Sequence, residues 1–530
     1  MTSPGVIWRT VRHLKPRQVA YQLINRLRKP AKLCFPNLSP AGHFLHVPEA
    51  DKPVSWKNGT FTFLNQSVCF GGTDDKDSID EIDWNYSANG KLWTYNLTYF
   101  DFLNQPSLST EEGLRFIYDF IKKISAIKDG LEPYPTSLRI NNWGHFLSRN
   151  KIQDDLINAH LFAQVDLLGR RLEYHLGGNH LLENGFALFM GGLYFQEEKW
   201  TQTAAALIQA ELCTQILDDG GHDERSPMYH QLLLDRLLDV LLVLQYHSWY
   251  SNAAFINFIA RKAGQMIDWL AGVTFTNGSI PMMNDAASGI ATTTAKLLKK
   301  AQRFGVTPVQ SQLKESGYRM FRTGRYELLA DVGSIGPDHQ PGHAHADTFS
   351  FVLSVDNCPI IVDSGTSTYE VSNRRAWERS TAAHNTVEVN GQSSSEVWSS
   401  FRVGRRAQVT VLEDTPTSLS ARHDGYQHLS VLHERTWLVD STQLRITDRL
   451  LTKEQALGVA RFHFHPDVRV VIDDNKVKAG SLGMVFLGEF ELTIKMVDYE
   501  MASGFNQLRP AQCIDVFFIH SLQTTVTIVE

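Results

Sequence analysis

Apolar residues recur at helical spacing through roughly the first 300 residues of the sequence. The segment 109–127 begins with Ser109 and Glu112 at the spacing of a capping box, and its apolar residues form one stripe. Residues 50–100 instead suggest short strands and turns. Similar helical patterns occupy 151–169, 181–197, 201–217, 230–249, 253–272 and 292–304. Successive helices joined by short turns predict a helical array or toroid.

The pattern changes near residue 315, where β-branched residues become frequent and often alternate with polar ones. Gly, Asp and Asn interrupt the strand-like stretches, which cover 318–333, 349–365, 385–391, 407–414, 429–450 and 514–530. Many short strands with such turns predict a β-sandwich or barrel. We therefore predict an α+β multidomain protein with a basic segment over 1–48, a helical domain over 49–310 and a β domain over 311–530.

The charge balance argues against one class of partner and leaves another open. The 530 residues carry a net charge of −6 with no long charged run, so nucleic-acid binding is not expected. The first 48 residues, however, hold eight Lys or Arg and no Asp or Glu. They include one apolar helical face made of Val19, Leu23, Ile24 and Leu27. This segment predicts contact with a membrane surface or an assembly partner; the alternative is a helix docked on the body of the protein.

The sequence gives two further indications of location. No apolar stretch follows the early basic residues in the manner of a secretory signal, and no stretch has the length of a membrane-spanning helix. The five cysteines are scattered and odd in number, which argues against a disulfide framework. We therefore expect a cytoplasmic protein, with the basic segment as a candidate for membrane association.

Two helical segments concentrate polar residues where apolar ones are expected. In PYPTSLRINNWGHF, Arg139, Asn142 and Trp143 suit an acidic sugar, because a guanidinium pairs with a carboxylate and an exposed indole stacks on a ring. The alternative is a structured loop between helices. In GGNHLLENGFAL, His180 and Glu183 lie three residues apart and could share a helical face as a base and its orienting carboxylate. The alternative is a capping Asn179 beside a satisfied histidine.

A third polar cluster, DDGGHDERSPMYHQLL, surrounds Tyr229 at the start of a long apolar helix. A tyrosine can act as base or acid when neighbouring cations lower its pKa or when the substrate is suitably placed. A single tyrosine at a helix start more often serves packing, but His222, Glu224, Arg225 and His230 around it favour a functional role.

The stretch 342–351, GHAHADTFSF, places His343, His345 and Asp347 at alternate positions. On a straight strand they would share one face. A hairpin turning at 356–357 would put Asp363 opposite about residue 350, leaving it roughly 17 Å from His345 at about 3.3 Å per residue. Since no metal bridges that distance, either the two residues share no metal or the stretch is a folded loop and the strand begins near residue 349.

His384, just before another strand, is a third candidate ligand for the same metal. Two histidines and one aspartate suit Zn²⁺ with an open position or water. The alternative is that His345, Asp363 and His384 are three unrelated polar loop residues.

Taken together, these clusters resemble the heparinase II/III-like family of polysaccharide lyases, from about residue 90 onward. The most specific part is GHAHADTFSF followed by PIIVDSGTSTY and RSTAAHNTVEVNG; NHLLENG and SPMYHQ match motifs of the helical domain. The resemblance implies an incomplete (α/α) toroid followed by an antiparallel β-sandwich. It also implies an acidic polysaccharide substrate, such as a glycosaminoglycan or an exopolysaccharide.

Site residues follow from the same motifs. The resemblance implies a structural Zn²⁺ held by His345, Asp363 and His384. It assigns His343 to the substrate, Asn179 and His180 to the uronate, and catalysis to Tyr229. Glu183 and Tyr369 are further substrate-binding candidates. No Zn²⁺ role is implied for His343.

The implied reaction is β-elimination on a uronic-acid polymer. Removing the C5 proton builds charge on the carboxylate, which Asn179 and a histidine could neutralise. We expect Tyr229 to protonate the leaving O4 and either His180 or His343 to take the C5 proton; Tyr229 acting in both roles remains open. Two alternatives are a non-catalytic glycan-binding or assembly protein, and a hydrolase using two carboxylates among Glu183, Asp223, Glu224 and Asp285.

Overall fold

The computed structural model describes residues 3–28, 32–70, 81–309 and 312–529. The chain forms two compact units, which we describe separately. The helical unit comprises 15–215 and 233–263, and the sheet unit comprises 1–14, 216–232 and 264–530. The predicted boundary between residues 310 and 311 lies outside the described residues, so the linear division into three domains stays a prediction.

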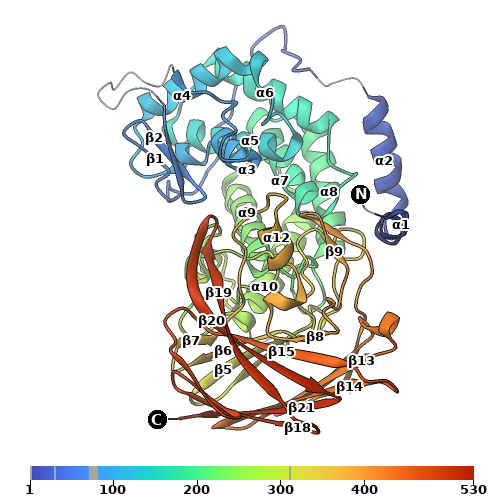
Figure 1. Ribbon diagram of the computed structural model, residues 1–530. Helices are drawn as coiled ribbons and strands as arrows, with labels where there is room; N and C mark the ends of the chain where they lie inside the picture. Colours follow the sequence, from blue (N-terminus) through green and yellow to red (C-terminus); the bar gives the residue numbers. More distant parts are fainter. Residues whose placement is uncertain (1–2, 29–31, 71–80, 310–311, 530) are drawn as a thin grey trace. The chain divides into compact units, whose positions relative to one another are not determined.

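The structure has a helix at every position where the periodicity predicts one, and most of these helices belong to the helical unit (Figure 1). In this unit, α5 packs against α6 and α7, and α7 packs against α8. A small antiparallel sheet, β1–β2–β3, belongs to the same unit. The elements of the helical unit up to residue 215 are α2 (Pro16–Leu27), β1 (Trp56–Lys57), β2 (Thr60–Phe63), β3 (Gln66–Cys69), α3 (Lys91–Tyr99), η2 (Asp101–Asn104), α4 (Thr110–Lys123), η3 (Ile124–Ala126), α5 (Pro133–Asn150), α6 (Asp155–Arg170), α7 (Gly178–Phe195) and α8 (Glu198–Gln215).

The local sequence explains where these helices begin. Ser109 and Glu112 form the predicted capping box of α4, and the Asp154 side chain caps α6. The expectation of strands and turns throughout 50–100 is wrong at 91–99, where α3 buries Trp93 and Leu97 on one side. Two long helices, α9 (Pro227–Tyr246) and α10 (Ala253–Val273), contribute residues to both units.

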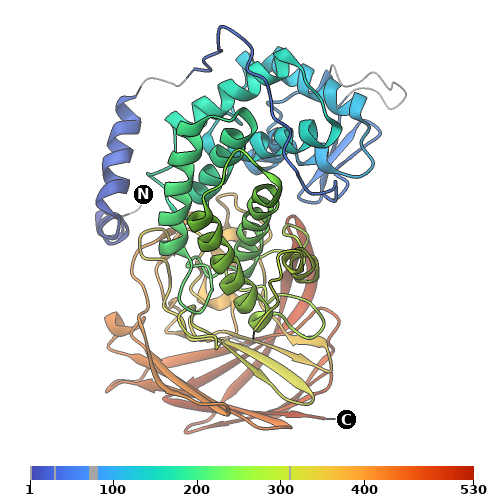
Figure 2. The same ribbon diagram turned by 180° about the vertical axis from the view of Figure 1, so that it is seen from behind.

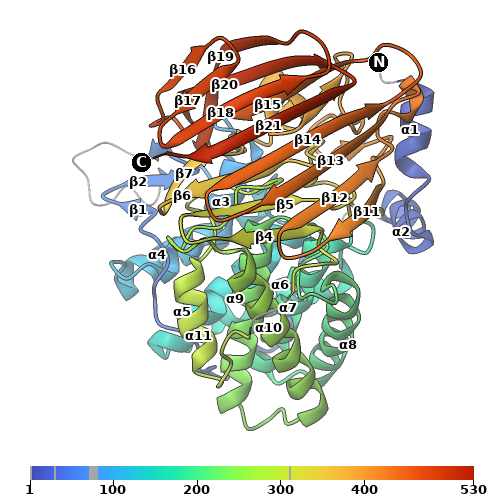
Figure 3. The ribbon, with the colours of Figure 1, turned by 90° about the horizontal axis from the view of Figure 1, so that it is seen from below.

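The sheet unit is built from antiparallel strands (Figure 3). An eight-stranded sheet has the order β11-β12-β13-β14-β21-β18-β17-β16, and two four-stranded sheets have the orders β19-β20-β15-β8 and β4-β5-β6-β7. The strands are β4 (Tyr318–Arg322), β5 (Tyr326–Asp331), β6 (Phe351–Val355), β7 (Cys358–Ile361), β8 (Val387–Val389), β9 (Val397–Trp398), β10 (Arg402–Val403), β11 (Val409–Asp414), β12 (Ser418–His423), β13 (Leu432–Val439), β14 (Gln443–Leu451), β15 (Leu457–His463), β16 (Val470–Asp473), β17 (Lys476–Ala479), β18 (Leu482–Gly488), β19 (Thr493–Gly504), β20 (Gln507–Ile519) and β21 (Ser521–Ile528). The unit also holds the helices α1 (Pro4–Val11), α11 (Thr294–Gln302), α12 (Asn373–Glu378), η4 (Thr381–Ala383) and η5 (Gln427–Leu429).

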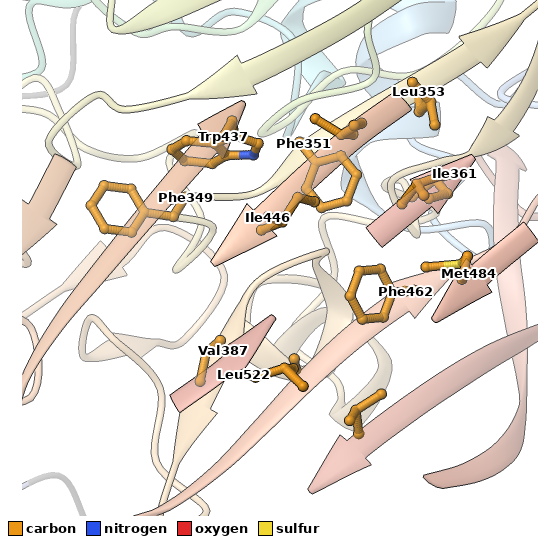
Figure 4. Close-up of a cluster of buried hydrophobic side chains, with 14 of the residues drawn as sticks. Phe349, Phe351, Leu353, Ile361, Val387, Trp437, Ile446, Phe462, Met484 and Leu522 are labelled. Carbon is orange, nitrogen blue, oxygen red and sulfur yellow. The ribbon is translucent and has the colours of Figure 1, made fainter. Parts of the chain in front are cut away.

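One apolar core connects the three larger sheets (Figure 4). Along β13, β14 and β21 buried and more exposed side chains alternate, as expected for strands with one face on a core. β5 and β6 are buried at every position. Trp437, Phe351 and Phe462 supply some of the largest apolar surfaces in this core. Among the described residues, no helix is both long enough and apolar enough to cross a membrane.

Candidate functional site

Tyr229 lies in the first turn of α9, where a serine fixes the helix start. Ser226 Oγ accepts a hydrogen bond from the Tyr229 amide at 3.3 Å and donates to the Asp285 carbonyl at 2.8 Å. The first of these bonds is the usual contact of an N-cap residue. Ser226 therefore holds the start of α9 against the loop that carries Asp285.

The Asp285 carboxylate is buried at the centre of the site. Arg375, on α12, donates to its two oxygens at 2.5 and 2.7 Å. His343 Nδ1 lies 2.9 Å from one oxygen, and His345 Nε2 lies 2.9 Å from the other. Burial alone would raise the pKa of Asp285, but Arg375 and the two histidines hold that pKa well below its usual value. Asp285 is therefore an ionised acceptor that orients both imidazoles.

An ionised carboxylate can only accept hydrogen bonds, so each histidine donates to Asp285. We therefore assign the proton of His343 to Nδ1, which leaves the lone pair on Nε2. The same reasoning places the proton of His345 on Nε2. The His343 side chain is 12% exposed, whereas that of His345 is completely buried. Only His343 can present its unprotonated nitrogen to a molecule from solution.

Two tyrosines lie beside His343. The rings of Tyr229 and His343 have centroids 4.0 Å apart, and the hydroxyls of Tyr229 and Tyr369 are 3.2 Å apart. The Arg375 guanidinium lies 5.1 Å from the centre of the Tyr369 ring. Within the sheet unit, two half-buried tyrosines therefore lie beside the oriented imidazole of His343 and the buried guanidinium of Arg375.

The stretch 342–351 is a folded loop, and the straight-strand alternative is wrong. β6 begins at Phe351, and the turn residues Asp356 and Asn357 have φ values of 48° and 66°, which suit a tight hairpin. Arg379 donates to the Ala344 carbonyl at 2.9 Å, and its own carbonyl accepts from the Ala346 amide. The conformation of the loop is therefore set by contacts on both sides of His345.

The three predicted metal ligands lie close together. The rings of His345 and His384 have centroids 5.3 Å apart, and His384 Nδ1 lies 2.7 Å from the Asp363 carboxylate. Within the described residues, His345 Nδ1 and His384 Nε2 are buried without hydrogen-bond partners. These two nitrogens suit a metal such as Zn²⁺, while Asp363 is engaged in orienting His384.

The same part of the chain does not present a complete metal site. Among the residues that the structure describes, no group of three or more His, Cys, Asp or Glu side chains is arranged to hold a metal ion. The Asp363 carboxylate also accepts from the Gly365 amide at 2.9 Å. The donor types fit Zn²⁺, and zinc binding by His345, Asp363 and His384 stays a prediction.

The helical unit holds the other predicted residues. Two glycines with positive φ, Gly177 and Gly178, start α7 and place Asn179 and His180 in its first turn, as expected. His180 Nδ1 lies 3.4 Å from Glu173, and its ring lies 4.3 Å from that of Tyr134. The His180 side chain is about one-third exposed, while Asn179 is buried.

Glu183 is buried one turn further along α7. Its carboxylate lies 3.2 Å from Arg236 and 3.3 Å from the Asn141 amide. Burial raises the pKa of Glu183, and Arg236 partly offsets that effect. The carboxylate beside His180 Nδ1 is that of Glu173, whereas Glu183 is ion-paired with Arg236; the predicted pairing of His180 with Glu183 stays a prediction.

The expectation of an exposed sugar-stacking indole is wrong. Trp143 is completely buried in α5 and packs edge-on against Phe100. Arg139 is also fully buried, where it donates to Gln164 and to the Thr98 carbonyl. Asn142 is buried as well and binds the Tyr99 carbonyl. Arg139 and Asn142 therefore make their hydrogen bonds inside the helical unit, as buried polar side chains generally do, and Trp143 serves apolar packing there.

Arg375 is not among the residues predicted from the sequence, and Asp285 was predicted only as a candidate carboxylate of a hydrolase. Asp285 and Arg375 are 90 positions apart, so no spacing rule connects them. The only local signal was a polar asparagine–aspartate pair following PMM, in a stretch otherwise suited to burial. A fully buried Arg375 indicates a necessary acidic partner, but that burial is visible only in the structure.

The chain matches two models of one protein family. Residues 136–310 match Heparinase II/III N-terminus, and residues 306–518 match Heparinase II/III-like, C-terminal. The chain belongs to the heparinase II/III-like family. A heparin-sulfate lyase of Bacteroides stercoris is 23% identical over 367 residues, covering 63% of this chain and 51% of that protein. FtsZ-localized protein C of Caulobacter vibrioides is 27% identical over 307 residues, covering 52% and 50%. The chain spans about half the length of these relatives.

Solved structures show the same fold. A heparinase III structure superposes with a TM-score of 0.67 at 16% identity, covering all of this chain and 94% of that one. Chondroitin AC lyase of Streptomyces coelicolor gives 0.50 at 11% identity, covering 83% and 75%. The predicted fold class, an incomplete (α/α) toroid followed by an antiparallel β-sandwich, is confirmed.

Proposed function

We propose that the protein is a polysaccharide lyase that cleaves a uronic-acid-containing polysaccharide by β-elimination. The observation that carries the proposal is the pairing of Tyr229 with an imidazole, His343, whose tautomer Asp285 fixes. The names of its relatives support an acidic glycan as substrate, since they include a heparin-sulfate lyase and a structure solved with chondroitin sulphate.

The chemistry assigns separate tasks to the two side chains. His343 Nε2 accepts the C5 proton, and Tyr229 donates its hydroxyl proton to the leaving O4. The resulting imidazolium lies between Asp285, at 2.9 Å, and Glu224, at 3.9 Å, and both carboxylates stabilise its charge. Tyr369, hydrogen-bonded to Tyr229, orients the hydroxyl and contacts the sugar.

The uronate carboxylate gains negative charge as the C5 proton leaves, so hydrogen-bond donors must be directed toward it. We assign that task to Asn179 and His180 at the start of α7, where backbone amides and the helix dipole also favour an anion. His180 remains the second candidate for the base. Exchanging either histidine for glutamine separates the two assignments, because only loss of the base abolishes proton transfer.

A hydrolase mechanism is less consistent with the site. Such a mechanism needs one carboxylic acid that can donate a proton and one carboxylate that activates water. Asp285 cannot supply the acid, since Arg375 and two histidines keep it ionised. Glu183 is already ion-paired with Arg236 in the helical unit.

The second candidate function is a non-catalytic glycan-binding or assembly protein that acts in the production of surface polysaccharide. One observation favours it: a relative is named for its position with FtsZ and not for a reaction. A binding protein needs no oriented base, so retention of the Asp285–His343 pair favours the lyase.

The test is a panel of uronic-acid polymers, including the host's own surface polysaccharide, monitored by the ultraviolet absorbance of the unsaturated product. We expect product with at least one polymer and about 10²-fold less with Tyr229→Phe. Leu487→Ala, at an exposed position on β18 in the sheet unit, is the control and should keep full activity. Glycan binding without unsaturated product would favour the second candidate.

We also propose that a structural Zn²⁺ binds His345 and His384 through their unpartnered nitrogens, with a carboxylate from Asp363. When bound, the metal would cross-link two loops and stabilise the folded state. Elemental analysis of protein purified without added metal should find about one zinc per chain. His384→Ala should lose the metal and lower the thermal midpoint; retained zinc in this variant would contradict the assignment.

A further inference from the structure

Helix α2 contacts its own unit through its polar side. Gln18 donates to the Leu176 carbonyl at 2.9 Å, and Asn25 lies 3.2 Å from a ring nitrogen of His175. Between them, the Tyr21 ring packs 4.7 Å from another aromatic ring of the same segment, 174–176. Gln18 is buried, which is unusual for a glutamine on a short surface helix.

The apolar side of α2 faces away from these contacts. At about 100° per residue, Leu23 and Leu27 point roughly opposite to Gln18 and Asn25. Leu27 is 87% exposed and Leu23 is 56% exposed. The exposed apolar face consists of Val19, Leu23, Ile24 and Leu27. The helix is docked on its unit, as the alternative in the sequence analysis held, but it docks through its polar side and leaves the apolar face exposed.

Basic residues border this apolar face along both edges. Helical geometry places Lys15 and Arg26 along one edge and Arg17 and Arg28 along the other, and all four are exposed. No acidic residue occurs in the first 48 residues. An apolar strip between two rows of cations is the arrangement of helices that lie in the interface of an anionic membrane.

Helix α1, in the sheet unit, is attached in the same manner. Arg9 forms an ion pair with Glu396 at 2.7 Å, and Thr10 accepts a hydrogen bond from the Trp398 indole at 3.1 Å. Its apolar residues face solvent, and Trp8 is 65% exposed. Tryptophan is enriched at the boundary between water and lipid.

We propose that the apolar face of α2 binds the surface of a bilayer containing anionic lipids. The four apolar side chains would enter the boundary of headgroups and acyl chains, while Lys15 and Arg26 contact anionic headgroups. On the other edge, Arg17 lies over the Tyr174 ring and Arg28 donates to the Arg170 carbonyl. A second copy of the chain is a poorer occupant. A symmetric pair of α2 helices would bring basic edges together, with no acidic residue on either helix to compensate.

The test is co-sedimentation of the full chain with vesicles of phosphatidylcholine alone or of phosphatidylcholine with phosphatidylglycerol. We expect binding only to the anionic vesicles, weakened by added salt. Leu23→Glu should reduce the partition coefficient at least tenfold. Leu487→Glu changes a residue of similar exposure, 54%, in the sheet unit and should leave binding unchanged.

The electrostatic contribution to membrane binding is tested with a separate variant. Arg26→Ala should reduce binding about fivefold, the contribution of one cation near an anionic surface. Equal binding to both vesicle types would contradict the anionic requirement. Absence of binding, or self-association that Leu23→Glu abolishes, would overturn the proposal. Unsaturated-product formation from soluble polymer provides a fold control that does not depend on membrane binding.

Discussion

At the residue scale, the site depends on one buried carboxylate. Asp285 joins Arg375, His343 and His345 within hydrogen-bond distance, and its ionised state sets the tautomer of both histidines. The sequence supplied the two histidines and Tyr229 through their motifs. It could not supply the connection to Asp285, because long-range pairing depends on how loops fold and not on residue spacing.

We expect Asp285→Asn to lower kcat about 100-fold with a smaller change in KM. The asparagine amide cannot accept from both imidazoles as the ionised carboxylate does, so His343 loses its fixed tautomer. Steady-state kinetics, normalised to the folded fraction from near-ultraviolet circular dichroism, measures the effect.

Asp448 offers a matched control for this substitution. It is another fully buried aspartate of the sheet unit, and it pairs with Arg435 and His433 at 2.7 Å each. Asp448→Asn should destabilise the protein by about 3–5 kcal/mol, since it disrupts a buried ion pair, and leave kcat per folded molecule unchanged. Equal losses of kcat in both variants would show that Asp285 acts only through stability.

At the scale of elements, periodicity and capping predicted the helices of the helical unit well. α6, α8 and α10 begin within four residues of their expected starts. The sequence failed at α5, whose many polar side chains suggested a substrate surface. Those side chains are buried because neighbouring helices and loops supply their hydrogen-bond partners, as for Arg139.

The capping box of α4 gives a direct test at this scale. Ser109→Ala should lower the free energy of unfolding by about 1 kcal/mol, because the Glu112 amide loses its acceptor. Urea denaturation measures the change. Ser125→Ala, at an exposed position in η3, should stay within about 0.5 kcal/mol of the wild type. A loss at Ser125 equal to that at Ser109 would rule out capping as the cause.

At the scale of the whole molecule, the order of the sequence does not match the order of the compact units. Residues 216–232, which carry Tyr229, belong to the sheet unit although they lie within the helical part of the sequence. The linear prediction could not anticipate this, because a change of hydrophobic period marks a change of element type and not a change of packing partner. The family resemblance, and not the periodicity, indicated a role for Tyr229 together with residues of the β domain.

Buried neutral histidines make stability depend on pH. Burial lowers the pKa of His230 to about 3 and that of His423 well below its usual value. Their unfolded counterparts bind protons below about pH 6.5, so the unfolded state binds more protons there and stability falls as pH drops. Glu183, whose pKa burial raises, acts in the opposite direction. The difference in the pH dependence of the free energy of unfolding between wild type and His230→Gln therefore reports on His230 alone.

Between pH 6.5 and 5.5, we expect the free energy of unfolding of the wild type to fall by about 1 kcal/mol more than that of His230→Gln. Urea denaturation at both pH values measures each free energy of unfolding. The same pH dependence in both proteins would contradict a neutral His230 in the folded state.

The central claim is that the protein acts by elimination and not by hydrolysis. The most direct test is to let the protein digest, in H₂¹⁸O, a polymer that it cleaves, and to measure the masses of the products by mass spectrometry. Elimination breaks the C4–O4 bond without adding water, so we predict unsaturated products free of ¹⁸O. Products that carry one ¹⁸O at each new reducing end and lack the double bond would contradict the account.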